Sequence, residues 1–420
     1  MRYWIFLIIG FVTLHSAYAD DQSSADSISL SQVMVKVLEN NPQILLADYE
    51  SRAAVIRIEQ ARQSSAAQFS IELENFAGSG AFGGSDRLET TLSLAKVLET
   101  GRKPELRERI ALQQADLLKN EQDAKKLDLL AETTRRFIHL VLDQHKLELA
   151  KNKLSIVTAT QGVVRKRVRL GKSPIAEQRR VKIELERAKI ELEHSEHELE
   201  TSRLKLTSMW GNISPTLITA QADIYALQDV GSFDELEELL ERNPDLVQFA
   251  TKERLATARI NLAKSRSSSD IEVSGGIKHF NATSDTALVL SASVPFGSSL
   301  RARPYINEAQ LLSRMTPHNL EQRRITLHTN LFELYQEIRH AFYAVKSLRQ
   351  SIIPEAELVL RDYRRGYEAG RYSLIELNNA QRALLDARLE AAVIASNYHR
   401  NRIEIERLTG KHMAQSEIRP

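Results

Sequence analysis

The chain has 420 residues, of which 27% are charged and only 6% are aromatic, a balance that suits long exposed helices better than one compact core. Its formal net charge of +2, without a basic patch interleaved with aromatic residues, gives no reason to expect a nucleic-acid partner. The chain contains no cysteine, which excludes disulfides and a lipid attached to an N-terminal cysteine.

The N-terminal residues 1–19 are typical of a cleaved secretory signal peptide. Arg2 supplies a positive start, an apolar run follows over 3–14, and Ala17-Tyr18-Ala19 is a cleavage motif. The run is shorter than the roughly 20 residues of a spanning helix. We therefore expect removal of this segment and a mature, exported chain that starts at Asp20.

The rest of the chain divides into two similar halves, at 20–230 and 231–420. A four-residue motif with Asn-Pro appears in both halves with a shift of 202 residues, and a set of Gly and Glu positions recurs with a shift of 199. The two halves match in their Pro residues, their Gly residues and their helix ends, all at a nearly constant shift. This pattern indicates an internal duplication. The matches are Glu39-Asn40-Asn41-Pro42 with Glu241-Arg242-Asn243-Pro244, Gly171 with Gly370, Glu177 with Glu376, and Gly211 with Gly410.

The first half predicts a fixed order of elements. A short amphipathic helix (about 29–39) and a helix after Pro42 precede a β-hairpin at about 67–98. A long helix follows at about 102–170, because good helix formers continue without proline from Pro104 to Pro174. A Gly-containing turn, a return helix at about 174–210 and an equatorial link complete this half.

The hairpin prediction depends on period-two alternation. Phe69, Ile71 and Leu73 interleave with polar residues, and an apolar set at 88–94 does the same, which gives one apolar and one polar face. Each run is about ten residues, the length of a tilted strand that crosses a bilayer. The pattern fits a soluble hairpin equally well. If the strands do span, several chains must pool them, because four strands cannot close a barrel.

The second half predicts the same order, with a β-hairpin at about 270–296, a long helix at about 303–369, a return helix at about 373–409 and a C-terminal tail. Pro317 and Pro354 fall inside the long helix, where proline kinks or ends a helix. In each half the two shorter helices together match the length of the long one. We therefore expect them to stack end to end beside it, with the strands at one end and the Gly turn at the other. Seven-residue spacing of Leu185, Leu192, Leu199 and Leu206 indicates knobs-into-holes packing, which fits an ordinary coiled coil and a barrel of helices equally well.

This order of elements behind a signal peptide resembles the TolC-type outer membrane factors over nearly the whole mature chain. The pieces that carry the resemblance are the duplicated Asn-Pro motif and the stretch Tyr367-Glu-Ala-Gly370-Arg-Tyr-Ser-Leu-Ile-Glu376-Leu-Asn-Asn-Ala-Gln381. Two further stretches, Ile71-Glu-Leu-Glu-Asn-Phe-Ala-Gly78 and Leu92-Ser-Leu-Ala-Lys-Val-Leu-Glu-Thr-Gly101-Arg-Lys103, resemble the CzcC-like heavy-metal efflux branch.

The resemblance implies a mixed α and β fold, mostly of long α-helices. Three chains would form a homotrimer with a 12-stranded transmembrane β-barrel, four strands from each chain, continuous with a periplasmic α-helical barrel. The protein would lie in outer membrane lipid and extend into the periplasm. It would act as a passive gated duct that receives small toxic solutes, heavy-metal cations among them, from a periplasmic adaptor and an inner-membrane efflux pump.

The resemblance also implies roles for the two turns. Glu376 falls on a position that lines the periplasmic gate in the family, and Glu177 is its partner in the first repeat. The next acidic family position is Asn379 here, a departure that weakens a double acidic ring. The tip candidates for adaptor docking are Gly171, Lys172, Gly370 and Arg371, and the basic cluster 165–169 nearby either steers a partner or caps a helix end.

We expect no catalytic residues, no metal site and no cofactor. His194 and His197 lie three residues apart on a predicted helix, but two ligands without a third are weak evidence for a metal site. No motif predicts an enzyme. Two other functions stay open on the residues alone: an outer membrane duct of a protein or peptide secretion system, and a soluble periplasmic coiled-coil scaffold or adaptor.

Overall fold

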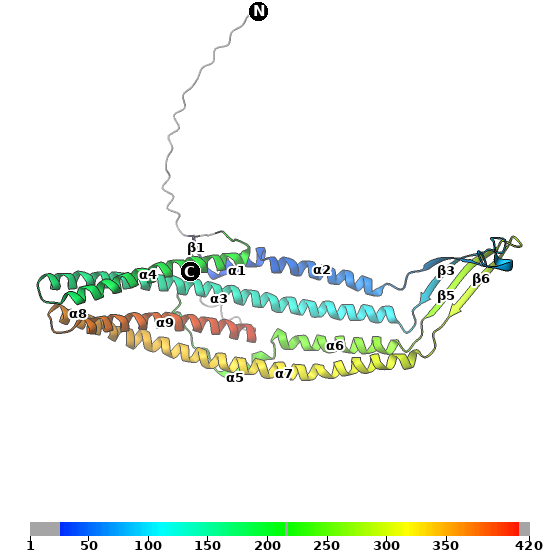
Figure 1. Ribbon diagram of the computed structural model, residues 1–420. Coiled ribbons are helices and arrows are strands. Elements are labelled where there is room, and N and C mark those ends of the chain that lie inside the picture. Colours follow the sequence, from blue (N-terminus) through cyan, green and yellow to red (C-terminus); the bar gives the residue numbers. More distant parts are fainter. Residues whose placement is uncertain (1–25, 215–216, 411–420) are drawn as a thin grey trace, which may run out of the picture.

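The computed structural model describes residues 26–214 and 217–410, which form an elongated helical bundle with a small sheet at one end (Figure 1). The predicted signal peptide and the C-terminal tail beyond residue 410 lie outside these described residues. Among the described helices, none has the length and apolar character needed to cross a membrane.

The elements of the first half follow one another in the predicted order. They are β1 (Asp26–Ile28), α1 (Leu30–Asn40), α2 (Pro42–Arg62), β2 (Gln68–Glu74), β3 (Glu89–Leu98), α3 (Lys103–Arg169), α4 (Ile175–Thr207) and β4 (Ile218–Ala220). Short 3₁₀ turns lie at Gly80–Phe82 and Ser208–Trp210. The two three-residue strands, β1 and β4, form a parallel pair that was not among the predicted elements.

The second half repeats this order without a counterpart of the β1–β4 pair among its described residues. Its elements are α5 (Phe233–Leu240), α6 (Pro244–Ser265), β5 (Ile271–Phe280), β6 (Asp285–Ser293), α7 (Ser298–Ser347), α8 (Ile353–Glu368) and α9 (Leu374–Thr409).

The helix expected at 303–369 is interrupted by a π-helical turn. This turn, Leu348–Ile352, separates α7 from α8, and the Ile353 N–H bonds the Leu348 carbonyl five residues back. Pro354 then falls in the first turn of α8, directly after the π-helical turn. Pro317 lies inside α7 and does not end it.

The helices pack in the arrangement that their lengths predicted. In the first half α2 and α4 both lie along α3, and in the second half α6 lies along α7 while α9 lies along α7 and α8 (Figure 1). Contacts of α3 with α6 and α9 join the halves. All these helices run lengthwise, so the sheet occupies one end and both helical turns occupy the other.

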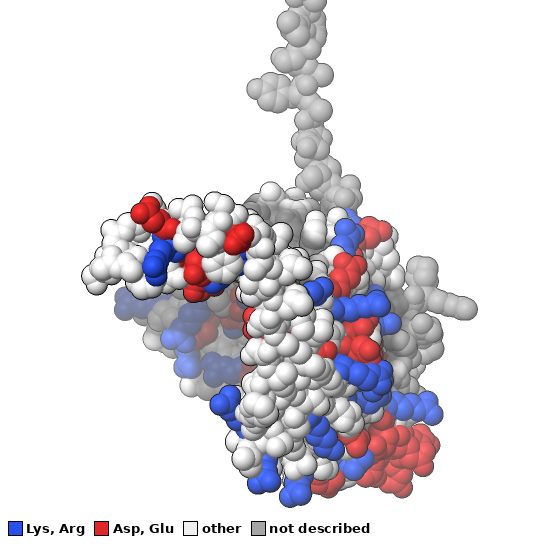
Figure 2. All heavy atoms as spheres, turned by 90° about the vertical axis from the view of Figure 1, so that its right-hand side faces the viewer, with Lys and Arg blue, Asp and Glu red and all other residues white. Residues whose placement is uncertain are grey.

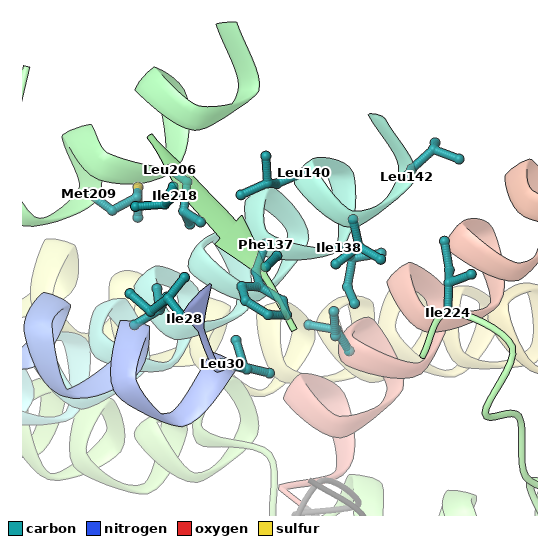
Figure 3. Close-up of a cluster of buried hydrophobic side chains, with 14 of the residues drawn as sticks. Ile28, Leu30, Phe137, Ile138, Leu140, Leu142, Leu206, Met209, Ile218 and Ile224 are labelled. Carbon is teal, nitrogen blue, oxygen red and sulfur yellow. The ribbon is translucent and has the colours of Figure 1, made fainter. Parts of the chain in front are cut away.

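The middle of the bundle holds the largest apolar cluster. Phe137 of α3 is 1% exposed and lies among side chains of α1, β1, β4 and the end of α4 (Figure 3). Full burial of such side chains contributes about 1.5–3 kcal/mol each. The short β1–β4 pair closes over this cluster, with Ile28 and Ile218 buried in it.

The duplicated Asn-Pro motif has the same structural role in both halves. Asn41 is the N-cap of α2 and Asn243 the N-cap of α6; each side-chain oxygen accepts a bond from the backbone N–H two residues on, at 2.8 and 2.7 Å. Each side-chain amide also donates, at 2.7 Å, to a carbonyl near the end of the return helix, that of Met209 or Leu408. One buried Asn thus fixes two helix ends.

Candidate functional site

The two turns at the helical end share one backbone geometry. Gly171 follows α3 with φ +70°, and Gly370 follows α8 with φ +78°, a left-handed conformation that suits glycine. In both, the N–H after the glycine bonds a carbonyl five residues back: Lys172 to Arg167 at 2.9 Å and Arg371 to Gly366 at 2.8 Å. These are Schellman motifs, which satisfy the last carbonyls of each helix.

Glu376 is used by the start of its own helix. Its carboxylate accepts bonds from the backbone N–H and hydroxyl of Ser373 at 2.8 and 2.9 Å, and the Ser373 hydroxyl accepts from the Glu376 N–H at 3.4 Å, forming a capping box. The bond from the Ser373 N–H, with that from its hydroxyl, lowers the pKa of the exposed Glu376 carboxyl below its ordinary value. Glu376 is therefore an anion at neutral pH.

Glu177 is tied to the other half of the chain. Its carboxylate accepts a 2.8 Å bond from the hydroxyl of Tyr367, a side chain that is 1% exposed. Burial and the nearby Glu177 raise the pKa of the Tyr367 hydroxyl to about 12, so the phenol keeps its proton and stays a donor at any physiological pH.

Arg167 completes this contact between the halves. Its guanidinium lies 4.7 Å from the centre of the Tyr367 ring and donates to the Tyr367 and Glu368 carbonyls at 2.6 and 3.2 Å. It also donates to the Ser173 hydroxyl at 3.0 Å. The sequence left two roles open for the basic cluster 165–169, steering a partner or capping a helix end. Arg167 caps a helix C-terminus, and that helix is α8 rather than α3, to which Arg167 belongs.

Of the other predicted residues, Lys172 joins this contact through its backbone carbonyl, which accepts a bond from the Arg167 guanidinium at 3.3 Å. Asn379 is exposed on α9, one turn after Glu376. Gly171, Lys172, Gly370 and Arg371 are exposed at the turns themselves.

Sequence reasoning missed Arg167, Tyr367 and Gly366 as one unit. A Cβ at Gly366 would lie 2.1 Å from a ring carbon of Tyr372, so this glycine makes room for the Tyr372 ring. The first repeat has Arg167 where the second has Gly366, so equivalent positions of the two turns carry a long basic side chain in one half and no side chain in the other. The signal available was this mismatch between otherwise duplicated turns.

The sheet at the opposite end has one continuous apolar face. Its order is β2-β3-β5-β6 and all pairs are antiparallel. The register places Ile71, Leu92, Ile277 and Leu288 side by side in one row across the four strands. These side chains are exposed, Leu288 by 82%. Seen from this end, a broad surface carries neither sign of charge (Figure 2).

The other face of the sheet is polar and mostly acidic. The ammonium group of Lys278 bonds Glu74 at 2.6 Å and Glu89 at 2.8 Å, and the Ser70 and Ser93 hydroxyls bond each other at 2.7 Å. By the register, five carboxylates lie on this face against that single ammonium: Glu72, Glu74, Glu89, Glu272 and Asp285.

His194 and His197 do not share a ligand. His194 lies 3.4 Å from Glu198 and His197 lies 2.9 Å from Glu193, each one helical turn away. In the part of the chain that the structure describes, no group of three or more candidate ligands could hold a metal ion.

The comparison that decides the family covers both halves of the chain. The model of the family described as outer membrane efflux protein matches residues 33–212 and again residues 236–411. The chain belongs to this family. The TolC-type resemblance is thereby confirmed, and the double match supports the internal duplication.

Individual relatives of this outer membrane efflux protein are distant. It is 24% identical to the cobalt-zinc-cadmium resistance protein CzcC of Cupriavidus metallidurans over 284 residues, 68% of each chain. The fold is similar to that of CusC, with TM-score 0.71, 17% identity and coverage of 90% of this chain and 91% of the other. It is also similar to MtrE of Neisseria gonorrhoeae, with TM-score 0.72, 18% identity and coverage of 91% and 88%.

Family membership establishes the class of function. The protein is an outer membrane channel of tripartite efflux systems that extends into the periplasm, and it is not an enzyme. The soluble scaffold considered above is therefore wrong, because the chain belongs to a family of outer membrane channels. Channels of this family are trimers that work with an adaptor and an inner-membrane pump.

Proposed function

We propose that three copies of this chain pool their sheets into a 12-stranded barrel in the outer membrane. The sheet with its exposed apolar face is the observation that carries this proposal. Its outer strands, β2 and β6, each have one neighbour within the described chain, so their free edges need partners in lipid. Closure by two further copies satisfies both edges, turns the apolar face to lipid and turns the polar face to the lumen.

The helices would continue this barrel as a tunnel across the periplasm, narrowed at the turns. The bond from Tyr367 to Glu177 and the cap that Arg167 places on α8 hold the two helical hairpins of one chain together. We propose that this contact keeps the inner end closed, with Glu177, Glu376 and Asn379 as gate residues. Gly171, Lys172, Gly370 and Arg371 would meet a periplasmic adaptor linked to an inner-membrane pump.

The cargo we propose is a divalent metal cation. Two observations support it: the named function of the distant relative CzcC in cobalt, zinc and cadmium resistance, and the acidic surplus on the polar face of the sheet. Carboxylates that line a narrow lumen favour cations over anions. A duct for secreted proteins or peptides would share this architecture. Identification of the cargo therefore distinguishes a metal efflux channel from a secretion duct.

The test is metal tolerance in a strain of the source organism that lacks this chain and any redundant duct. We expect increased sensitivity to cobalt, zinc or cadmium, and rescue by the wild-type chain. Unchanged tolerance to all three metals, with loss of a secreted protein from the medium, would instead establish the secretion duct.

The architecture has its own test. The mature protein, extracted in detergent and imaged by electron microscopy, should be a hollow cylinder with three-fold symmetry and a short barrel at one end. A thin solid rod, or a particle without three-fold symmetry, would contradict the pooled barrel whatever the cargo.

A further inference from the structure

The helical end carries a large excess of positive charge that the net charge of the chain conceals. The matched segments around the two turns, 161–182 and 360–381, contain twelve Lys and Arg against four Asp and Glu, a net charge of +8. Since the whole chain carries +2, the remainder carries −6. The chain is thus strongly polarised along its length.

The acidic groups of these segments leave most of the basic ones unpaired. Glu177 and Glu376 accept bonds from Tyr367 and Ser373, and the one ion pair among the described residues of the two segments joins Arg364 and Glu368 at 3.6 Å. Arg167 is held by backbone carbonyls. The other ten basic side chains are all exposed: Arg165, Lys166, Arg169, Lys172, Arg179, Arg180, Lys182, Arg361, Arg365 and Arg371.

Apolar side chains are exposed among these charges. Leu170 and Ile175 flank the first turn and are 60% and 54% exposed, while Tyr372 and Ile375 at the second turn are 42% and 51% exposed. An apolar centre within a charged rim is the usual composition of a surface that contacts another protein. Contact with lipid does not explain the exposure of these residues, because the membrane strands lie at the opposite end of the molecule (Figure 1).

We propose that the helical end docks a protein whose contact surface carries Asp and Glu side chains around an apolar tip. This inference rests on the adaptor docking proposed above and specifies the chemistry of that adaptor. Like charges gathered at one end repel, and three copies in a trimer multiply the repulsion, which an acidic partner relieves. Complementary charge also raises the association rate and disfavours partners with basic tips.

Binding of two synthetic probes tests the proposal. Both are disulfide-closed helical hairpins with leucines at the turn; one has flanking glutamates and the other has lysines at the same positions. We expect the detergent-solubilised trimer to bind the glutamate hairpin, with an affinity that falls as salt is added, and not the lysine hairpin. The double variant Arg165→Glu, Lys166→Glu should weaken binding by about tenfold or more.

A matched control separates docking from general charge attraction. Lys125 and Lys126 are consecutive exposed residues of the same helix, α3, about 45 positions before Gly171 of the turn. Reversal of both to Glu should leave binding of the glutamate hairpin unchanged. Equal binding of the two hairpins, no binding of either, or equal loss in this control would overturn the proposal.

The hairpin assay does not depend on the cargo. If the wild-type chain fails to restore metal tolerance, the cargo proposal fails while the hairpin result stands. If the wild type restores tolerance and the Arg165→Glu, Lys166→Glu variant restores it equally well, the basic end is not needed for docking and the inference fails alone.

Discussion

At the scale of single residues, Asn41 and Asn243 show why a motif recurs in two halves that have otherwise diverged. Each is buried and uses both ends of its amide, one as helix N-cap and one as donor to the carbonyl of a return helix. Neither Asp nor Ser supplies both an acceptor and a donor in those two directions. The requirement is therefore for Asn itself.

We predict that Asn243→Asp destabilises the protein although it keeps the capping oxygen. The change sets a carboxylate oxygen against the Leu408 carbonyl, a loss of about 1–3 kcal/mol or more for buried polar groups left without partners. The melting temperature of the purified variant, compared with that of the wild type, measures this loss of stability. Asn40→Asp, at an exposed neighbour of the other motif, is the control, and equal stability of both variants with wild type would refute the dual role.

We predict that Tyr367→Phe loosens the inner end. The variant keeps the ring under Arg167 but removes the donor to Glu177, a bond to a charged group of about 1.5–3 kcal/mol. Single-channel recordings in planar bilayers should show higher mean conductance or more frequent opening. Tyr363→Phe, one turn earlier on α8, is the control. Identical conductance of Tyr367→Phe and wild type would show that this bond does not hold the gate.

The candidate site could be predicted from the sequence only in part. The two turns and their glycines follow from duplicated Gly positions between helix-forming runs. The bond from Tyr367 to Glu177 does not, because it joins residues 190 positions apart and has no counterpart in the other repeat, where Val168 replaces Tyr367. Single-sequence spacing carries no information on which hairpin faces which.

At the scale of elements, the sequence predicts where the strands lie, but it does not predict which strands pair. Period-two alternation predicts both hairpins and which residues share a face, but it cannot pair β3 with β5. The β1–β4 pair has three residues per strand, too short for any periodicity, and depends on burial of Ile28 and Ile218 against α3 and α4. The π-helical turn Leu348–Ile352 was not predicted either, because Pro354 indicates a kink or an end of the helix but not which of the two forms.

We predict that Leu288→Arg prevents assembly in the outer membrane while Val289→Arg is tolerated. These neighbours lie on opposite faces of β6, with Leu288 in the apolar row. An arginine that faces lipid near the bilayer centre costs about 2–4 kcal/mol per chain, whereas a lumen-facing one stays hydrated. The yield of trimer in outer membrane fractions measures the difference. Equal yields would mean that the apolar face does not meet lipid.

At the scale of the whole molecule, charge and apolar surface are separated along the long axis. The apolar sheet face lies at one end, and the basic turns lie at the other. A cation that enters at the basic end meets the proposed gate carboxylates, Glu177 and Glu376, and then the five carboxylates on the polar face of the sheet. Because basic side chains outnumber the carboxylates at the entrance, selectivity would then depend mainly on the membrane end.

We predict that the triple variant Glu72→Gln, Glu272→Gln, Asp285→Asn reduces cation selectivity. It removes three carboxylates of the polar face and leaves Lys278 bound to Glu74 and Glu89. Reversal potentials across a salt gradient in planar bilayers should shift toward the anion value, and the shift should shrink at high ionic strength. A reversal potential equal to that of wild type at low salt would place selectivity elsewhere.

The pairing of β3 with β5 also dictates an order of events during biogenesis. Paired positions in these strands are separated by 173 residues at Leu98–Ile271 and by 191 at Glu89–Phe280. A chain exported N-terminus first therefore presents the first hairpin with an unpaired edge until β5, in the first quarter of the second half, has arrived. Such distant pairing forms slowly, and a free apolar edge recruits other strands. We therefore expect a chain truncated before Ile271 to aggregate rather than insert.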